Sequence, residues 1–512
     1  MLELASLIAH HARFRAEATA VVVEDERLSW REFAARVARS ANALRTLGVR
    51  KGDRVATLLG NGRELLEAYW AAPSLGAVLV PLSPLLTASG LAALLRDCAP
   101  RCVFTSRALL PALRSALQEL ARADGIRVLV VDGDDGDDVL DYAALAGAAS
   151  DRLVPEEVTP DDPFNVMYTS GTTGQPKGIV HTHFIRAMYA LLMGAAWRMT
   201  PESVVLHTGA IVFNGAFVTL MPSFYQGGTY VLCRQFDAEH AIDVIERERV
   251  THVMLVPSQI IAILNAPGFR AERLASLETV LSLGAPLHQD SKDRLNRLLP
   301  NRFYELYGLT EGFVTILDRS EAIRKSGSVG KPPVFYRMRI VREDGSECAP
   351  GEVGEIVGRG PILMPGYYHR PDLTAQAIRD GWLHSGDLGY VDEDGYLYLV
   401  DRKKDMIDSG GVKVYPKDVE EIAIRHEAVL EVAVFGVPDD TWGESPLAAV
   451  VLREGAKVTP EALREWINAR VAARYQRVRE VVVLPAFPRN AAGKILKREL
   501  REPYWAGRAA RI

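Results

Sequence analysis

Segments with strand character alternate with helical segments through the middle of the chain. Strands separated by helices cannot form tight hairpins, so they pair in parallel and the helices cover the sheet. In that architecture ligands bind beyond the C-terminal ends of the strands. Residues 284–286 and 307–311 follow two predicted strands and are therefore candidate binding loops. The predicted strands are 229–233, 251–256, 279–282 and 302–306, and the predicted helices between them are 238–249, 258–264 and 289–299.

The length of the chain and the changes in residue pattern along it indicate several folding units. The 512 residues far exceed the usual size of one domain, about 150 residues. After Gly327, short strands and glycine-rich turns predict small antiparallel or barrel structure, and another unit follows the charged stretch 401–405. We predict an α/β protein whose large N-terminal domain, residues 1–403, combines stacked parallel-sheet subdomains with a small β-barrel. Residues 404–512 form a small α+β domain that includes a helix over 460–475.

The composition excludes several classes of protein. Hydrophobic residues make up 48% and charged residues 24% of the chain, as in ordinary globular proteins. The net charge of −5 gives no indication of nucleic acid as a partner. The four cysteines, none in a CxxC pair, fit a reducing compartment rather than a disulfide framework or a zinc site. The N-terminus lacks signal-peptide features, and prolines and glycines interrupt the uncharged stretches 68–86 and 204–233. We expect a cytoplasmic protein without a membrane span.

The segment 168–178 has the composition of a phosphate-binding loop. Its eleven residues include three glycines, four serine or threonine side chains and one lysine. Glycines let backbone N–H groups approach an anion, hydroxyls donate further hydrogen bonds, and the lysine supplies positive charge. Pro176 stands where the Walker pattern requires a second glycine, so this is a different kind of phosphate loop. The apolar residues 164–168 and 179–180 anchor it on both sides, which argues against a flexible surface loop.

This segment and four others resemble the motifs of the adenylate-forming superfamily. That superfamily comprises acyl-CoA synthetases, peptide-synthetase adenylation domains and luciferases. The five motifs occur in the family's order, and the resemblance extends over nearly the whole chain. The other four segments are 307–311, 385–387 within 382–390, 401–405 together with 409–411, and 488–494.

The resemblance implies a nucleotide site with a magnesium ion. Glu311 and Thr172 would bind Mg²⁺, because this hard cation prefers oxygen ligands. Tyr307 would pack on the adenine, Asp387 would accept hydrogen bonds from both ribose hydroxyls, and Arg402 would contact the nucleotide. The residues expected around the phosphates and the base are Thr169, Ser170, Gly171, Thr172, Thr173, Gly174, Lys177, Gly284, Ala285, Pro286, Gly308 and Thr310.

The resemblance also implies two half-reactions that use different faces of the C-terminal domain. Lys494 would catalyse adenylation, supported by Thr172 and Glu311, by holding the attacking carboxylate beside the α-phosphate. The small domain would then rotate about a hinge at Lys404, so the resemblance implies a mobile domain. The residues expected to line the tunnel for the CoA thiol are Ser409, Gly410 and Gly411.

The pocket for the acid is expected to be apolar. A gap-free alignment on Gly227 and Gly228 puts Asn214 where amino-acid-activating relatives have an aspartate for the α-ammonium group. Asparagine cannot supply that charge, which argues against an amino-acid substrate. The same alignment puts Val212 where many acyl- and aryl-CoA ligases have histidine. Asn214 bonds either an oxygen of the acid or the nearby backbone. The predicted pocket residues are Val212, Phe213, Asn214, Phe217, Gly284 and Gly312.

We therefore expect a ligase that activates an uncharged fatty, alicyclic or aromatic acid with ATP and Mg²⁺ and transfers the acyl group to coenzyme A. One alternative acceptor is a separate carrier protein; no carrier domain follows within the 512 residues, which favours CoA. A non-catalytic acyl- or nucleotide-binding protein is a second alternative, disfavoured by the presence of Lys494, Glu311 and Asp387. Nothing in the sequence calls for the oxidation catalysed by luciferases. The expected assembly is a monomer or a homodimer.

Overall fold

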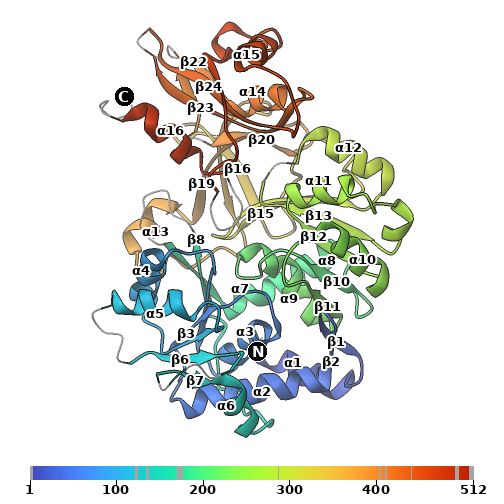
Figure 1. Cartoon of the computed structure of the whole chain (residues 1–512), viewed down its shortest axis with the longest axis vertical. Coiled ribbons are helices and arrows are strands. Elements are labelled where there is room, and N and C mark those ends of the chain that lie inside the picture. The colour runs from blue at the N-terminus through green and yellow to red at the C-terminus, as the bar shows by residue number, and fades with distance from the viewer. Residues whose placement is uncertain are drawn as a thin grey trace. The chain divides into compact units, whose positions relative to one another are not determined.

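The alternating segments form the centre of an eight-stranded sheet with the order β15-β14-β13-β12-β10-β11-β1-β2. The pairs from β11 through β10, β12 and β13 to β14 are parallel, as predicted, and β15 is antiparallel to β14. Helices α10 (Ala238–Glu248), α11 (Pro257–Asn265) and α12 (Gln289–Leu298) connect these strands and flank β12 and β13 (Figure 1). The strands are β1 Thr19–Val23, β2 Glu26–Ser29, β10 Val204–His207, β11 Thr229–Leu232, β12 His252–Leu255, β13 Thr279–Leu283, β14 Phe303–Leu309 and β15 Phe313–Leu317.

These coordinates are a computed structural model. It describes residues 4–120, 125–133, 136, 138–169, 177–285, 287–402, 405–409, 412–439, 441–489 and 495–506. Contacts divide the chain into two compact units. The first comprises Met1–Arg337 with Arg359–Leu383, and the second comprises Met338–Gly358 with His384–Ile512. Lys404 lies outside the described residues, and the domain boundary at 403/404 stays a prediction.

The first unit contains a second, seven-stranded sheet with the order β7-β6-β5-β3-β4-β8-β9. Its pairs are parallel except β8 with β9, which form an antiparallel hairpin. The strands are β3 Arg54–Leu58, β4 Val78–Leu82, β5 Cys102–Thr105, β6 Arg127–Val130, β7 Leu140–Asp141, β8 Pro163–Thr169 and β9 Lys177–Thr182. The helices before and between them are α1 Leu4–Phe14, α2 Trp30–Thr46, α3 Arg63–Ser74, α4 Ala88–Cys98, α5 Leu110–Gln118 and α6 Tyr142–Ala148.

Both uncharged stretches break into short elements. Pro73 lies in the last turn of α3, and β4 follows it directly. The stretch 204–233 divides into β10, the helix α9 (Phe217–Gln226) and β11. Within the described ranges, each helix is too short or insufficiently apolar to cross a membrane.

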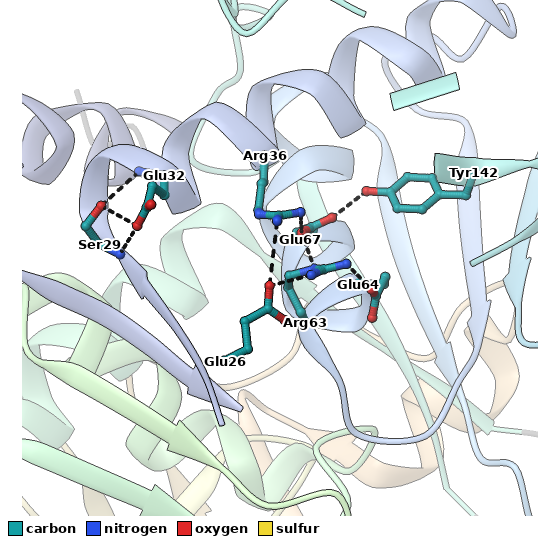
Figure 2. Close-up of polar contacts among 8 residues, drawn as sticks. All are labelled: Glu26, Ser29, Glu32, Arg36, Arg63, Glu64, Glu67 and Tyr142. Carbon is teal, nitrogen blue, oxygen red and sulfur yellow. Dashed lines mark hydrogen bonds and ion pairs between the residues drawn. The ribbon is translucent and has the colours of Figure 1, made fainter. Parts of the chain in front are cut away.

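Helices α2, α3 and α6 are joined by polar contacts (Figure 2). Ser29 and Glu32 form a capping box at the start of α2, because each side chain bonds the backbone N–H of the other. Glu67 on α3 is buried and accepts a hydrogen bond of 2.5 Å from the Tyr142 hydroxyl. Its other carboxylate oxygen lies 3.1 Å from Nε of Arg63. Burial raises the pKa of Glu67, although Tyr142 and Arg63 oppose this effect.

The strands of the predicted barrel form a five-stranded sheet, which together with the C-terminal sheet belongs mainly to the second unit. Strand β19 (Trp382–Val391) lies between β17 (Gly354–Arg359) and β20 (Leu397–Arg402), and β16 (Arg337–Val341) pairs with β17. Further along the chain, β22, β21, β24 and β23 form a sheet, with β25 parallel to β24. Its elements are β21 Ile407–Ser409, β22 Val412–Val414, α14 Pro416–Ala423, β23 Val429–Asp439, β24 Gly443–Leu452, α15 Pro460–Asn468, β25 Glu480–Val483 and α16 Lys497–Trp505. The predicted fold class is confirmed: the first unit has parallel-sheet subdomains, a curled five-stranded sheet stands where a small β-barrel was predicted, and an α+β unit follows.

The predicted helix over 460–475 is too long. Helix α15 ends at Asn468, and a separate 3₁₀ turn covers Arg474–Gln476. The Asn468 side chain bonds both backbone groups of Val478, at 2.9 and 2.8 Å. These two hydrogen bonds end the helix at Asn468 and direct the following chain into β25.

Candidate active site

Two loops lie at the C-terminal ends of neighbouring strands, as the topology predicted. Strand β13 ends at Leu283, which is paired with Leu306 of β14. Gly284 and Ala285 follow β13 and are exposed, while Pro286 lies outside the described residues. Near the end of β14, Tyr307 is half-buried and Gly308 is exposed. The candidate base-binding residues of this unit therefore lie on adjacent strand ends, open to a ligand.

The ends of the predicted phosphate loop are opposite each other in a hairpin. Thr169 of β8 pairs with Lys177 of β9. The residues predicted between them, Ser170, Gly171, Thr172, Thr173 and Gly174, lie outside the described residues.

A lysine, a tyrosine and a glutamate meet beside this hairpin. The ammonium group of Lys177 lies 5.5 Å from the centre of the Tyr367 ring. The Tyr367 hydroxyl donates a hydrogen bond of 2.9 Å to Oε1 of Glu311. The pKa of Tyr367 is raised mainly by burial and further by the charge of Glu311. Its hydroxyl therefore keeps the proton that it donates. The structure thus brings together two predicted site residues and one, Tyr367, that sequence reasoning missed.

The backbone around Glu311 is tightly fixed. Gly312 has a φ of +111°, and a Cβ atom there would lie 2.0 Å from the carbonyl oxygen of Ile362. On the same side, the Met364 N–H donates a hydrogen bond of 2.8 Å to the Glu311 carbonyl. Only glycine at position 312 permits the backbone of residue 362 to approach this closely. This explains why the predicted pocket residue at this position is a buried glycine.

The donor set at Glu311 fits a magnesium ion shared with phosphate. Oε1 is held by Tyr367, whereas Oε2 accepts no hydrogen bond from the described residues. The described residues contain no group of three or more potential metal ligands. A single carboxylate is nevertheless the usual protein contribution where a nucleotide supplies further oxygens to Mg²⁺. Among the residues that the structure describes, Glu311 is therefore the predicted ligand that could hold this cation.

The predicted acid-pocket wall lies against the end of β13. A Cβ atom at Gly215 would be 3.1 Å from the Leu283 side chain, so the turn after β10 packs beside the loop that begins at Gly284. Asn214 donates a hydrogen bond of 3.0 Å to the Tyr189 hydroxyl, and its own oxygen is buried without a partner among the described residues. The amide N–H of this side chain thus bonds a tyrosine rather than backbone.

The other predicted wall residues are largely enclosed by protein. Val212 is buried, and Phe213 is half-buried. Phe217 has no exposed surface: its ring stacks on Tyr69 at 5.4 Å, and the Arg186 guanidinium lies 3.8 Å from the ring centre.

A fully buried arginine and histidine connect this wall to the Glu311 turn. Arg186 donates hydrogen bonds to Oδ1 of Asn165 at 2.9 Å and to Nδ1 of His181 at 3.1 Å. The other ring nitrogen of His181 lies 2.9 Å from the Thr310 carbonyl oxygen. The pKa of His181 is held well below its usual range, mainly by burial and further by the charge of Arg186. Burial lowers the pKa of Arg186 to about 10. This value is still well above neutral pH, so the side chain stays cationic.

Sequence reasoning missed both residues, although a signal was present for His181. His181 and Lys177 are four residues apart on one strand and so share a face. A histidine on the same strand face as the loop lysine is a candidate for the site.

The second unit positions the predicted ribose ligand. Asp387 of β19 is the cross-strand partner of Arg402 in β20, and their charged groups are 3.6 Å apart. Ser409 is buried at the end of β21. The remaining predicted residues of this unit, Lys404, Gly410, Gly411 and Lys494, lie outside the described residues.

Asp401 lies next to Arg402 and is half-buried. Its carboxylate accepts hydrogen bonds from the backbone N–H groups of Arg402 and Lys417. Burial raises the pKa of Asp401 to about 6, with Lys497 as the main opposing charge. Lys497 in turn forms an ion pair of 2.6 Å with Glu420.

Comparison with known families identifies the class of protein. The AMP-binding enzyme family matches residues 8–368, and the AMP-binding enzyme C-terminal domain matches residues 418–494. The chain therefore belongs to the AMP-binding enzyme family, as the five motifs predicted.

Individual relatives cover almost the whole chain. A feruloyl-CoA synthase of Amycolatopsis sp is 38% identical over 98% of this chain and 99% of its own length. The fatty acid–[acyl-carrier-protein] ligase ScoC of Streptomyces coeruleorubidus is 32% identical over 98% of this chain and 96% of its own length. Among solved structures, ATP-bound MatB from Rhodopseudomonas palustris superposes with a TM-score of 0.88 at 29% identity, covering 98% of this chain and 99% of MatB.

Proposed function

We propose that this protein is an ATP-dependent acid–CoA ligase that works through an acyl-adenylate. The acid carboxylate attacks the α-phosphorus of ATP, and pyrophosphate leaves. The thiol sulfur of CoA then attacks the acyl carbon, which gives acyl-CoA and releases AMP. The proposal rests mainly on the cluster of Lys177, Tyr367 and Glu311 at the strand ends beside the acid-pocket wall. The similarity to a feruloyl-CoA synthase supports it.

The chain's residues divide the work. Lys177 and the loop before it bind the ATP phosphates, and Glu311 holds Mg²⁺, which offsets phosphate charge when bound. Asp387 and Arg402 bind the ribose side of the nucleotide. Lys494 holds the carboxylate beside the α-phosphate during adenylation. The remaining assignments, including the hinge at Lys404 and the thiol tunnel at 409–411, follow the resemblance and stay predictions.

The proposed acid is uncharged and largely apolar. Val212, Phe213 and Phe217 offer no charge, and Asn214 provides the one amide of the wall. Each methylene buried against such a wall contributes about 0.8 kcal/mol, so fatty, alicyclic and aromatic acids all fit the chemistry. The feruloyl-CoA synthase relative favours testing aromatic acids first.

A carrier protein is the second candidate acceptor. The similarity to ScoC, which is named as a ligase that acts on an acyl carrier protein, is the observation that favours it. A purely acyl- or nucleotide-binding role is less well supported, because Glu311, Asp387 and Lys494 are all present. The cytoplasmic location and the monomeric or homodimeric state stay predictions from the sequence.

The test is acid-dependent release of pyrophosphate, measured with and without CoA over fatty, cinnamic, benzoic, alicyclic and amino acids. We expect release with one class of apolar acid and formation of the matching acyl-CoA. Release without any acyl-CoA product would favour the carrier protein instead.

A lysine variant tests the catalytic assignment. Lys494→Ala is expected to slow adenylation by about two orders of magnitude or more, while thioester formation from supplied acyl-adenylate continues. Lys457, an exposed lysine of the same unit, provides the matched control as Lys457→Ala. Equal loss of both half-reactions in the Lys494 variant would contradict its role.

A further inference from the structure

We infer that His181 and Arg186 are positioning residues for Glu311, and that they hold the β14–β15 turn in the conformation from which Glu311 reaches the magnesium ion of ATP. The inference rests on the proposed function, because it requires Glu311 to be the cation ligand. It adds two residues that none of the five motifs contains.

The hydrogen bonds determine which ring nitrogen of His181 has the proton. A guanidinium group has only donors, so Nδ1 of His181 must accept the bond of 3.1 Å from Arg186. The neutral ring then has its proton on Nε2, which donates to the Thr310 carbonyl at 2.9 Å. Arg186 therefore fixes the tautomer of His181, and His181 fixes the carbonyl that directly precedes Glu311.

The turn is held from two directions. His181 binds the carbonyl of residue 310, and the Met364 N–H binds the carbonyl of Glu311. Gly312 packs closely against the backbone of Ile362, which restricts movement of the turn on that side. Without the His181 bond, the peptide between residues 310 and 311 would lose the hydrogen bond that holds its carbonyl, and the backbone from which Glu311 extends would be held less firmly.

The burial of Arg186 calls for such a role. Its side chain has no exposed surface, and no carboxylate among the described residues forms an ion pair with it. An unpaired buried cation costs desolvation energy that an apolar side chain would avoid. What the guanidinium supplies is directed donors to Asn165 and His181, together with contacts to the Phe217 ring at 3.8 Å and the Tyr189 ring at 4.9 Å. Arg186 thus contacts the predicted acid wall and, through His181, the Glu311 turn.

The main test compares variants that keep or remove the bond to Thr310. His181→Leu removes both hydrogen bonds, whereas His181→Gln retains a donor long enough to reach the Thr310 carbonyl. His252→Leu is the matched control, since His252 is also buried and also bonds a backbone carbonyl, that of Trp197, at 2.9 Å. His252 begins β12, so it lies at the opposite strand ends from the candidate site.

Two readouts are needed. The first is the Mg²⁺ concentration for half-maximal pyrophosphate release at saturating acid and ATP, which His181→Leu should raise about fivefold, the effect of one ordinary hydrogen bond. The second is hydrogen–deuterium exchange of the amides of residues 309–314 in the free protein, which His181→Leu should accelerate. His181→Gln should restore both values toward those of the wild type, and His252→Leu should leave both unchanged.

The inference is overturned if His181→Leu has the wild-type Mg²⁺ dependence and exchange, or if His252→Leu changes both to the same extent. Should His181→Leu not fold, His181→Asn replaces it, because asparagine is polar but too short to reach Thr310. No pyrophosphate release by the wild type with any acid would contradict the proposed function instead, and the exchange measurement would still decide the positioning role.

Discussion

Replacing Tyr367 with phenylalanine isolates one contact of the candidate active site. The variant keeps the ring and its contact with Lys177, but it removes the hydroxyl that donates to Oε1 of Glu311 at 2.9 Å. Because the Tyr367 side chain is 9% exposed, water does not easily replace this donor. The carboxylate of Glu311 would lose the hydrogen bond that orients it within the proposed Mg²⁺ site.

The size of the effect follows from the type of hydrogen bond. Hydrogen bonds to charged groups contribute about 1.5–3 kcal/mol. Glu311 is half-buried, so the lower end of that range applies. A loss of about 1.4 kcal/mol corresponds to a tenfold change in an equilibrium or rate constant. We therefore expect Tyr367→Phe to lower kcat/KM of adenylation about tenfold at limiting Mg²⁺, with a smaller deficit at saturating Mg²⁺.

The assay is pyrophosphate release at a series of Mg²⁺ concentrations, together with a thermal melt. Tyr368→Phe is the matched control, since the adjacent ring stacks on His369 and its hydroxyl makes no hydrogen bond with the described residues. A wild-type Mg²⁺ dependence in Tyr367→Phe would refute the orienting role. An equal loss in Tyr368→Phe would show that the whole 366–369 segment, rather than one hydroxyl, is responsible.

Two further predictions concern stability and its pH dependence. Tyr142→Phe leaves an oxygen of the buried Glu67 carboxylate without its donor, so we expect the unfolding free energy to fall by about 1–3 kcal/mol in denaturant titrations. Tyr225→Phe, at an exposed tyrosine, should have little effect, and equal losses in both variants would contradict this account. For Asp401, the folded-state pKa of about 6 lies above the ordinary value of 3.8, so between these pH values the folded protein keeps a proton that the unfolded chain has lost. The contribution of Asp401 to wild-type stability should therefore decrease as pH rises from about 4 to about 6 and then level off. Asp401→Asn removes this titration, so its melting temperature should increase relative to that of the wild type over the same interval; a constant difference would show that Asp401 does not titrate there.

Local patterns predicted most of the elements near the site. The alternation over 229–306 gives the observed strands and helices because each segment has its own apolar periodicity and its own end signals. Helix α15 shows where this fails. Its last turn depends on Asn468 bonding Val478, ten residues further along, and helical propensity beyond 468 does not reveal that partner.

The sequence by itself determined the kind of chemistry: five motifs with glycine, hydroxyl, carboxylate and lysine in a fixed order identify an AMP-binding enzyme. It determined this because such motifs are contiguous, so their resemblance to those of the adenylate-forming superfamily can be recognised without the fold. Only the tertiary structure decided which side chains support them. Tyr367 reaches Glu311 across 56 residues, and His181 reaches the Thr310 carbonyl across 129 residues. Such contacts depend on how the sheets fold together, and no periodicity along the chain records which distant residue lies opposite a given side chain.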